Sequence, residues 1–409
     1  MEDQTTTTLP VGWKETTLGE VVEFQRGFDL PTQNRTAGKY PLVVSNGIDG
    51  FVDEYKVKGP GVVTGRSGTL GKVFFIKDNF WPLNTTLWVK DFKGNNEKFI
   101  YYWLLDFPFD KFNAGTGVPT LNRNHIHEVD VTLPKNETEQ QAIAAVLSSF
   151  DDKIELLQAQ NKTLENIAQL LFKHWFVDFE FPDKSGKSYK SSGGRMIDSE
   201  MGEIPEGWGT MTVEEFTSKI TKGTTPTSIG GSFSKEGINF IKAESITDDH
   251  AFDTAKVSHI DAQTNQLLSR SVIEDEDLLY SIAGTIGRFA VVQKTILPAN
   301  TNQAVAIIRV NKEISDPFYL QCSFLLRSVR EKLHGKVVEA VQANLSLTSL
   351  RECKIIMPDR SGFKLFKDTI RPLFDKIMSN NPQIQNLSKI REALLPKLIK
   401  GEIRVKGYE

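Results

Sequence analysis

The stretch Ser67-Gly68-Thr69-Leu70-Gly71-Lys72 returns 216 residues later as Ala283-Gly284-Thr285-Ile286-Gly287-Arg288. Both copies hold two glycines at the same spacing and end in a basic residue. At the same offset, Pro82-Leu83-Asn84-Thr85 returns as Pro298-Ala299-Asn300-Thr301. Glycine within otherwise strand-like sequence indicates a tight turn. The chain is therefore expected to contain the same glycine turn twice.

Four further pairs of segments keep the same order along the chain. They are residues 9–13 and 204–208, 120–134 and 344–358, 152–154 and 375–377, and 170–173 and 394–397. Coincidence of composition is the alternative, but ordered matches with slowly changing offsets favour a common origin. Two copies with so long a period predict a tandem duplication, since a solenoid stacks many short repeats.

Each half begins with strand-like sequence. Runs of β-branched and aromatic residues, bounded by Gly, Asn and Pro, predict strands. These runs are 61–64, 72–76, 87–89, 277–280, 288–292 and 304–310. Short helices are expected at 98–105 and 317–333. The sequence thus predicts two mixed α/β domains, at residues 1–136 and 200–362.

A long helix is predicted to end each half, in regions 137–180 and 363–409. Thr138 and Gln141 form a capping-box pattern at the first start. The first seam, alternately three and four residues apart, is Leu147, Phe150, Ile154, Leu157, Asn161, Leu164, Ala168 and Leu171. The second seam is Ile370, Leu373, Ile377, Ile384, Leu387, Leu394 and Leu398. Such heptad spacing is typical of a coiled coil, in which Asn161 would fix the register.

Two interruptions are expected. Asn381-Pro382 falls inside the second helix, where proline removes a backbone hydrogen bond, so a kink or short break is predicted there. Residues 181–199, rich in Ser, Gly and Lys, have the composition of a flexible linker between the halves. The predicted fold class is α+β, with an internal duplication.

Composition places the chain among globular proteins. Of its 409 residues 39% are apolar and 25% charged, and no run is long enough to span a membrane. No secretory signal is expected, and two cysteines, Cys322 and Cys353, suit a reducing cytoplasm. The net charge of −3 argues mildly against nucleic acid, but residues 363–409 alone carry +5.

No catalytic constellation is convincing. Gly186-Lys187-Ser188 lacks the upstream glycine of a phosphate-binding loop. Asp316-Pro317-Phe318-Tyr319 only partly matches an adenine methyltransferase motif, and His125 and His127 lack a third metal ligand. The sequence therefore favours a recognition or scaffolding protein without a metal or cofactor of its own.

Several segments together carry a family resemblance. They are Leu9-Pro10-Val11-Gly12-Trp13, Ile204-Pro205-Glu206-Gly207-Trp208 and residues 140–147, 150–154, 171–179 and 394–405. Across nearly its whole length the chain resembles the specificity (S) subunit of Type I restriction–modification systems. It departs from that pattern at Pro382, and at Asn302-Gln303-Ala304, where the first half has Thr86-Leu87-Trp88.

The resemblance implies that two target recognition domains each read one half of a split duplex DNA sequence. The two long helices would pair antiparallel, hold these domains apart and dock two methyltransferase (M) subunits. Those M subunits would bind S-adenosylmethionine and methylate adenine. Translocating restriction (R) subunits would bring ATP and Mg²⁺ chemistry, and the chain itself would catalyse nothing. The remaining hypotheses are a stand-alone nuclease or methyltransferase and a symmetric protein-binding scaffold.

Candidate DNA contacts are the basic and polar residues of the glycine turns and of the segments that correspond between the halves. They are Arg26, Arg66, Ser67, Thr69, Lys72, Asn122, Arg123, Lys222, Lys242, Thr285, Arg288 and Asn344. For each turn, a β-hairpin without ligand is the alternative. The residues expected to pair the helices or meet a partner are Leu147, Phe150, Ile154, Leu157, Leu164, Trp175, Phe176, Ile377, Leu387, Leu394 and Leu398.

Overall fold

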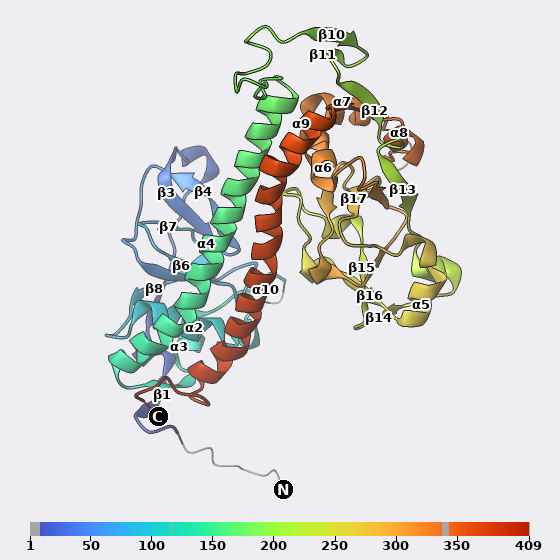
Figure 1. The fold of residues 1–409 in the computed structure, drawn as a ribbon. Helices are drawn as coiled ribbons and strands as arrows, with labels where there is room; N and C mark the ends of the chain where they lie inside the picture. The colour runs from blue at the N-terminus through green and yellow to red at the C-terminus, as the bar shows by residue number, and fades with distance from the viewer. Residues whose placement is uncertain (1–8, 116, 338–342, 409) are drawn as a thin grey trace. The chain divides into compact units, whose positions relative to one another are not determined.

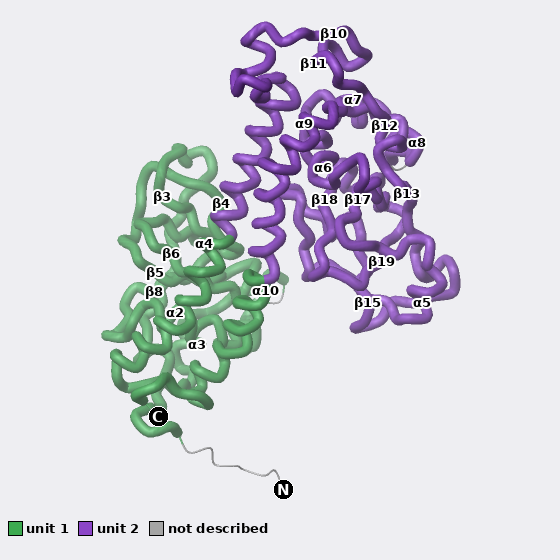
Figure 2. The backbone as a smooth tube through the Cα atoms, in the orientation of Figure 1, with its two compact units in different colours: residues 1–157, 383–409 green, residues 158–382 purple. Residues whose placement is uncertain are grey.

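The computed structural model describes residues 9–115, 117–337 and 343–408 (Figure 1). The chain forms two compact units (Figure 2). Unit 1 is Met1–Leu157 with Gln383–Glu409, and unit 2 is Gln158–Pro382. Two long helices, α4 (Glu137–Phe176) and α10 (Arg371–Ile399), run through both units, so that one part of each helix belongs to unit 1 and the other part to unit 2.

Unit 1 is built on a four-stranded antiparallel sheet. Its order is β2 (Glu23–Arg26), β8 (Thr86–Asp91), β5 (Gly61–Gly65) and β6 (Val73–Ile76). A second sheet has the order β4 (Gly47–Val52), β3 (Ala37–Val44) and β7 (Trp81–Pro82), in which β3 and β7 are parallel. A third sheet pairs β1 (Trp13–Thr17) with β9 (Asp130–Pro134). The helices are α1 (Leu18–Val21), α2 (Glu97–Leu105) and α3 (Arg123–His127).

Unit 2 repeats this plan. Its main sheet has the order β13 (Thr217–Lys222), β20 (Val305–Val310), β17 (Leu278–Ser281) and β18 (Phe289–Val291). The second sheet is β14 (Phe233–Ser234), β16 (Ser258–Ile260), β15 (Ile238–Ile241) and β19 (Ala299–Thr301), again with a parallel pair, β15 and β19. β12 (Gly209–Thr212) pairs with β21 (Lys354–Met357) as β1 does with β9. This shared order confirms the duplication.

The remaining elements of unit 2 complete its core. Its helices are α5 (Ala262–Leu267), α6 (Pro317–Leu325), α7 (Arg327–His334), α8 (Leu347–Arg351) and α9 (Arg360–Leu365). The expected helix at 317–333 is therefore two helices, α6 and α7. Every strand-like run named above lies on a strand, which confirms the mixed α/β interpretation.

The long helices pack against each other within each unit. In unit 1, Asp151 of α4 accepts a hydrogen bond from Arg391 of α10 at 2.6 Å, and Leu147 and Leu398 share one core. In unit 2, Asn161 of α4 bonds to Asn381. Further along α4, the ring of Phe172 lies against Phe366, which precedes α10. As the residue number rises along α4, the number of its contact in α10 and in the turn before α10 falls, which confirms that the two helices pair antiparallel.

The predicted break at Pro382 is wrong, because α10 runs through this residue without interruption. Tertiary contacts just before the proline hold the helix. Asn380 Nδ2 donates to Gln160 Oε1 at 2.9 Å and to Asn161 Oδ1 at 2.8 Å, and Asn161 Nδ2 donates to Asn381 Oδ1 at 2.8 Å. These bonds offset the loss of one backbone hydrogen bond.

Two further expectations need correction. Asn136, and not Thr138, caps α4, since its Oδ1 accepts the Thr138 N–H at 2.9 Å. The supposed flexible linker at 181–199 is folded. Phe181 stacks on Tyr189 with ring centroids 4.7 Å apart, and β10 (Met196–Ser199) pairs with β11 (Gly202–Pro205). Aromatic contacts order a segment whose composition suggested disorder.

Among the described residues, no helix combines the length and apolar character needed to cross a bilayer.

The ion pair in unit 1 provides a test of the helix pairing. Asp151 also accepts the Tyr102 hydroxyl at 2.5 Å. Burial, together with this bond, raises the pKa of Tyr102 well above its usual range, so the hydroxyl stays protonated and needs an acceptor. Asp151→Ala should therefore lower the free energy of unfolding by about 2 kcal/mol, measured by denaturant titration.

Asp152→Ala is the matched control for this change. The Asp152 carboxylate is 62% exposed and lies 3.9 Å from Lys98 Nζ. An exposed pair of this kind contributes less than about 1 kcal/mol. Equal losses for the two variants would contradict the role given to Asp151.

Candidate nucleic-acid interface

The first glycine turn, residues 66–72, joins β5 to β6 in unit 1. The Arg66 and Ser67 N–H groups both donate to Thr85 O, at 2.8 and 3.1 Å. Leu121 N donates to Arg66 O at 2.8 Å, and Gly68 N donates to the carbonyl of Pro119. Three segments far apart in the sequence therefore meet at this turn.

Glycine is required in and beside this turn. A Cβ added to Gly65 would lie 1.8 Å from Thr69 O. Gly68 and Gly71 have φ angles of +91° and +79°, which side chains rarely adopt. The repeated glycines Gly68 and Gly71 thus reflect the positive φ angles of a tight turn, as expected from the sequence, whereas Gly65 reflects the close approach of two backbone segments.

The second glycine turn is anchored in the same way in unit 2. Ile282 N and Ala283 N both donate to Ala304 O, at 2.8 and 3.3 Å, and Leu345 N donates to Ile282 O at 2.9 Å. Ala283 pairs with Asn344 as Ser67 pairs with Thr120. In addition, Thr285 Oγ1 donates to the carbonyl of Ala243 at 3.0 Å. The duplicated sequence therefore encodes similar backbone hydrogen bonds around both glycine turns, and these bonds are called the backbone frame below.

A basic residue ends the first strand of both main sheets. Arg26 precedes Gly27, whose N–H donates to Thr86 O at 3.1 Å, and Lys222 precedes Gly223, whose N–H donates to Asn302 O at 3.1 Å. A Cβ on either glycine would fall within 2.2 Å of a backbone oxygen. The two basic residues are thus held beside the segment that also anchors the glycine turn.

Arg26 and Arg66 belong to one polar cluster in unit 1. Arg26 Nη2 lies 3.6 Å from Asp29 Oδ1, and Asn84 Nδ2 donates to the same carboxylate. Arg66 Nη1 donates to Asn84 O at 3.4 Å. Asp29 and Asn84 are residues that the sequence did not single out, although Asn84 lies in a repeated segment.

The other candidates of unit 1 surround this cluster. Ser67 and Thr69 lie half-buried in the turn, whereas Lys72 is exposed and has no ion pair among the described residues. Asn122 caps α3, accepting the Asn124 N–H at 3.0 Å. Arg123 is exposed, and its Nη1 lies 3.5 Å from Phe24 O.

The candidates of unit 2 are less alike. Lys242 Nζ lies 4.9 Å from the ring centroid of Phe233, Lys222 is half-buried, and Asn344 is exposed. The guanidinium of Arg288 donates to Asp248 through Nε at 2.7 Å and through Nη2 at 2.6 Å. Asp248 carries no signal in the sequence, because only the folded chain brings it beside Arg288, 40 residues away.

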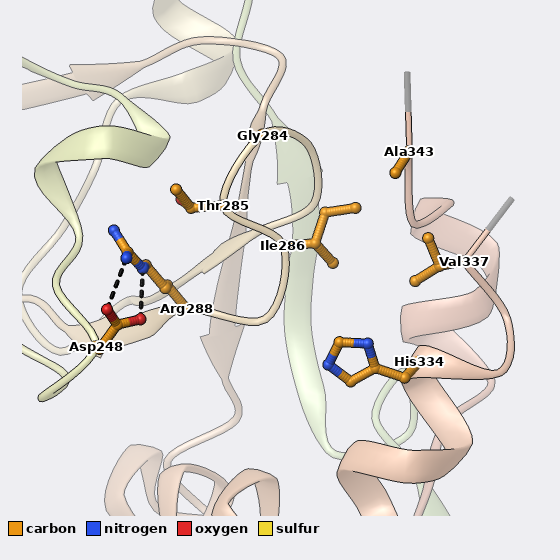
Figure 3. Close-up of a pocket in the computed structure, with 8 residues that line it drawn as sticks. All are labelled: Asp248, Gly284, Thr285, Ile286, Arg288, His334, Val337 and Ala343. Carbon is orange, nitrogen blue, oxygen red and sulfur yellow. Dashed lines mark hydrogen bonds and ion pairs between the residues drawn. The ribbon is translucent and has the colours of Figure 1, made fainter. Parts of the chain in front are cut away.

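A pocket of about 430 Å³ adjoins the second turn (Figure 3). Arg288, Asp248 and Thr285 lie to one side of the turn, and Ile286 points the other way, toward Val337 and His334. The structure thus brings Thr285 and Arg288 together at one concave surface.

The helix candidates mostly face the core. Fully buried members are Leu147, Ile154, Leu157, Phe176, Ile377 and Leu398, and half-buried members are Phe150, Leu164, Trp175, Leu387 and Leu394. Phe176 packs on Trp208 and Tyr319 of the globular part of unit 2. The six buried side chains therefore pack within the helix pair and against the globular parts, and they have no free surface with which to contact a partner.

The described residues hold no group of three or more potential metal ligands from His, Cys, Asp and Glu. His127 Nε2 instead accepts the Phe24 N–H at 3.1 Å, and burial lowers the pKa of this histidine. Its ring nitrogen is therefore part of the fold of unit 1.

Comparisons with known proteins agree with this architecture. The family described as "Type I restriction modification DNA specificity domain" matches residues 10–166 and again 205–386. The MjaIX specificity subunit of Methanocaldococcus jannaschii is 27% identical over 355 residues, covering 85% of this chain and 78% of that protein. The HindI specificity subunit of Haemophilus influenzae is 26% identical, covering 70% and 71%.

A solved structure shares the fold. The S subunit of a Type I restriction–modification system from M. genitalium superposes with a TM-score of 0.61 at 17% identity, covering 94% of this chain and 96% of that one. The two matches to the family fall on the two halves of the duplication and span most of the sequence. The chain therefore belongs to the specificity subunits of Type I restriction–modification systems.

Proposed function

We propose that this chain reads a split duplex DNA sequence, one half with the glycine turn of each unit. The observation that carries the proposal is one backbone frame, anchored in both units by two N–H groups on one carbonyl and by one further backbone bond, that presents different side chains. Lys72 in the first turn corresponds to Arg288 in the second. Different half-sites need different readers, and base readout requires only a few well-placed Arg, Lys, Asn and Gln side chains.

The chain's charge is compatible with such a role. A net of −3 makes the whole chain a poor phosphate binder, but residues 363–409 carry +5. Phosphate contacts supply most non-specific affinity. We therefore propose that partner subunits make part of the contacts with DNA phosphates, and that this chain recognises the DNA sequence.

We further propose that the chain catalyses nothing and docks two methyltransferase subunits. S-adenosylmethionine would bind to those subunits, and ATP and Mg²⁺ to restriction subunits that join them. Helix α4 exposes Ile167 and Leu170, which are 41% and 67% exposed and lie next to each other on one face at helical spacing. We assign this face of α4 to methyltransferase docking.

Two other functions remain to be separated by experiment. A stand-alone methyltransferase or nuclease would act on DNA without a partner, and a protein-binding scaffold would show no sequence preference. Purified chain should transfer no methyl group from labelled S-adenosylmethionine to DNA. Together with a candidate adenine methyltransferase, it should form a one-to-two assembly that methylates adenine within a split sequence. Methyl transfer by the chain alone, or an assembly without sequence preference, would refute the proposal.

The helix pair would also set the gap between the half-sites. The two helices run antiparallel, so both must be lengthened to keep the Asn161–Asn381 register. A heptad inserted between Asn161 and Leu164, matched by one between Ile377 and Asn380, adds about 10 Å of helix, the length of about three base pairs. We expect the methylated motif to gain up to about three base pairs in its spacer.

The one-sided insertion serves as the control, because it displaces the amide contacts and should lower the unfolding temperature. Sequencing of methylated DNA measures the spacer. A stable two-sided variant with an unchanged spacer would show that the helices do not set this distance.

A further inference from the structure

The Arg288–Asp248 pair differs in kind from the other basic candidates. The carboxylate engages the Nε and Nη2 atoms side by side, at 2.7 and 2.6 Å, and Ile246 O accepts from Nη1 at 3.3 Å. Arg288 is 30% exposed and Asp248 is 81% exposed. A two-point contact fixes the plane of the guanidinium, which a single-point contact with a lysine does not do.

This arrangement leaves a defined set of donors. A guanidinium carries five N–H groups, and three of them are engaged by Asp248 and Ile246. One N–H on Nη1 and one on Nη2 have no acceptor among the described residues. Donors on the Nη1–Nη2 edge of a guanidinium that is held in one plane match the O6 and N7 acceptors that guanine presents in the major groove.

The charge of the pair argues against a phosphate contact. Arg288 with Asp248 is neutral as a unit, and an exposed carboxylate beside the guanidinium would repel a phosphate. Lys72, at the corresponding place in unit 1, is exposed and has no ion pair among the described residues. The flexible, charged ammonium of Lys72 therefore suits a phosphate contact. The guanidinium of Arg288, which Asp248 holds in place and neutralises, suits contact with the edge of a base.

We infer that Arg288, positioned by Asp248, reads a guanine in the half-site of unit 2, while Lys72 contacts the DNA backbone in the other half-site. This inference rests on the proposed function and names the chemistry of one contact within it. The frame holds the reader firmly, since Thr285 is tied to the Ala243 carbonyl and Arg288 to the Ile246 carbonyl. Asp248 is a positioning residue, because it acts on the base through Arg288.

The test is selection of bound sequences from a library of random duplex DNA, using the full chain with its methyltransferase partner. The wild type should select two half-sites with a fixed gap. Arg288→Lys keeps the charge but loses the paired donors. It should reduce preference for guanine at one position of one half-site by about 5- to 150-fold, and leave the other half-site unchanged.

Asp248→Asn retains the size of the side chain and removes its charge. It should weaken the same guanine preference, at that position alone. Lys72→Gln is the matched control from the first turn. It should reduce affinity for all sequences alike and lower the slope of log affinity against log salt by about one.

The possible results separate the two claims. Failure of the wild type to select any split sequence would overturn the proposed function. A normal wild-type motif that Arg288→Lys leaves intact, with uniform loss of affinity, would overturn only the base-reading role. Thermal unfolding of each variant shows whether unit 2 is folded. Because Asp248→Asn keeps the bulk of the pair, it decides the matter if Arg288→Lys fails to fold.

Discussion

The antiparallel packing of α4 on α10 is the contact on which the rest of the structure depends. Each helix has an apolar seam that must be buried away from water, and the two helices bury these seams against each other. The same seams continue into the globular parts, through Leu147 and Leu398 in unit 1 and through Phe172 and Phe176 in unit 2. The amides of Gln160, Asn161, Asn380 and Asn381 favour this register, since a slip would break the two bonds that the fully buried Asn380 donates.

The duplication repeats the backbone frame of the glycine turn in both units, whereas the side chains that the two turns carry differ. Two N–H groups of each turn converge on one carbonyl, that of Thr85 in one copy and that of Ala304 in the other. Backbone contacts of this kind do not depend on the side chain, and the positive φ angles of the two glycines in each turn constrain only those two positions. The outward side chains were therefore free to change, which is what reading two different half-sites requires. Lys72 and the Arg288–Asp248 pair illustrate two chemically distinct outcomes on the same frame.

Sequence reasoning succeeded where backbone geometry or periodicity limits the choice of residue. The glycines flanking Thr69 and Thr285 and the seam around Ile154 belong to this class. It failed where long-range contacts decide: amide bonds to α4 override Pro382, and ring stacking orders the segment after Phe181. Asp248 was beyond reach for the same reason, because only the folded chain brings it to Arg288. Whether each candidate contacts DNA is still a prediction.

The central claim is that one chain carries two readers and thereby defines a split target. The most direct measurement is a base-resolution map of adenine methylation in genomic DNA from cells with and without this chain. The account predicts one motif that depends on the chain, made of two different half-sites separated by a fixed gap of unspecified bases. A continuous motif, two half-sites methylated independently, or a map unchanged by loss of the chain would contradict it.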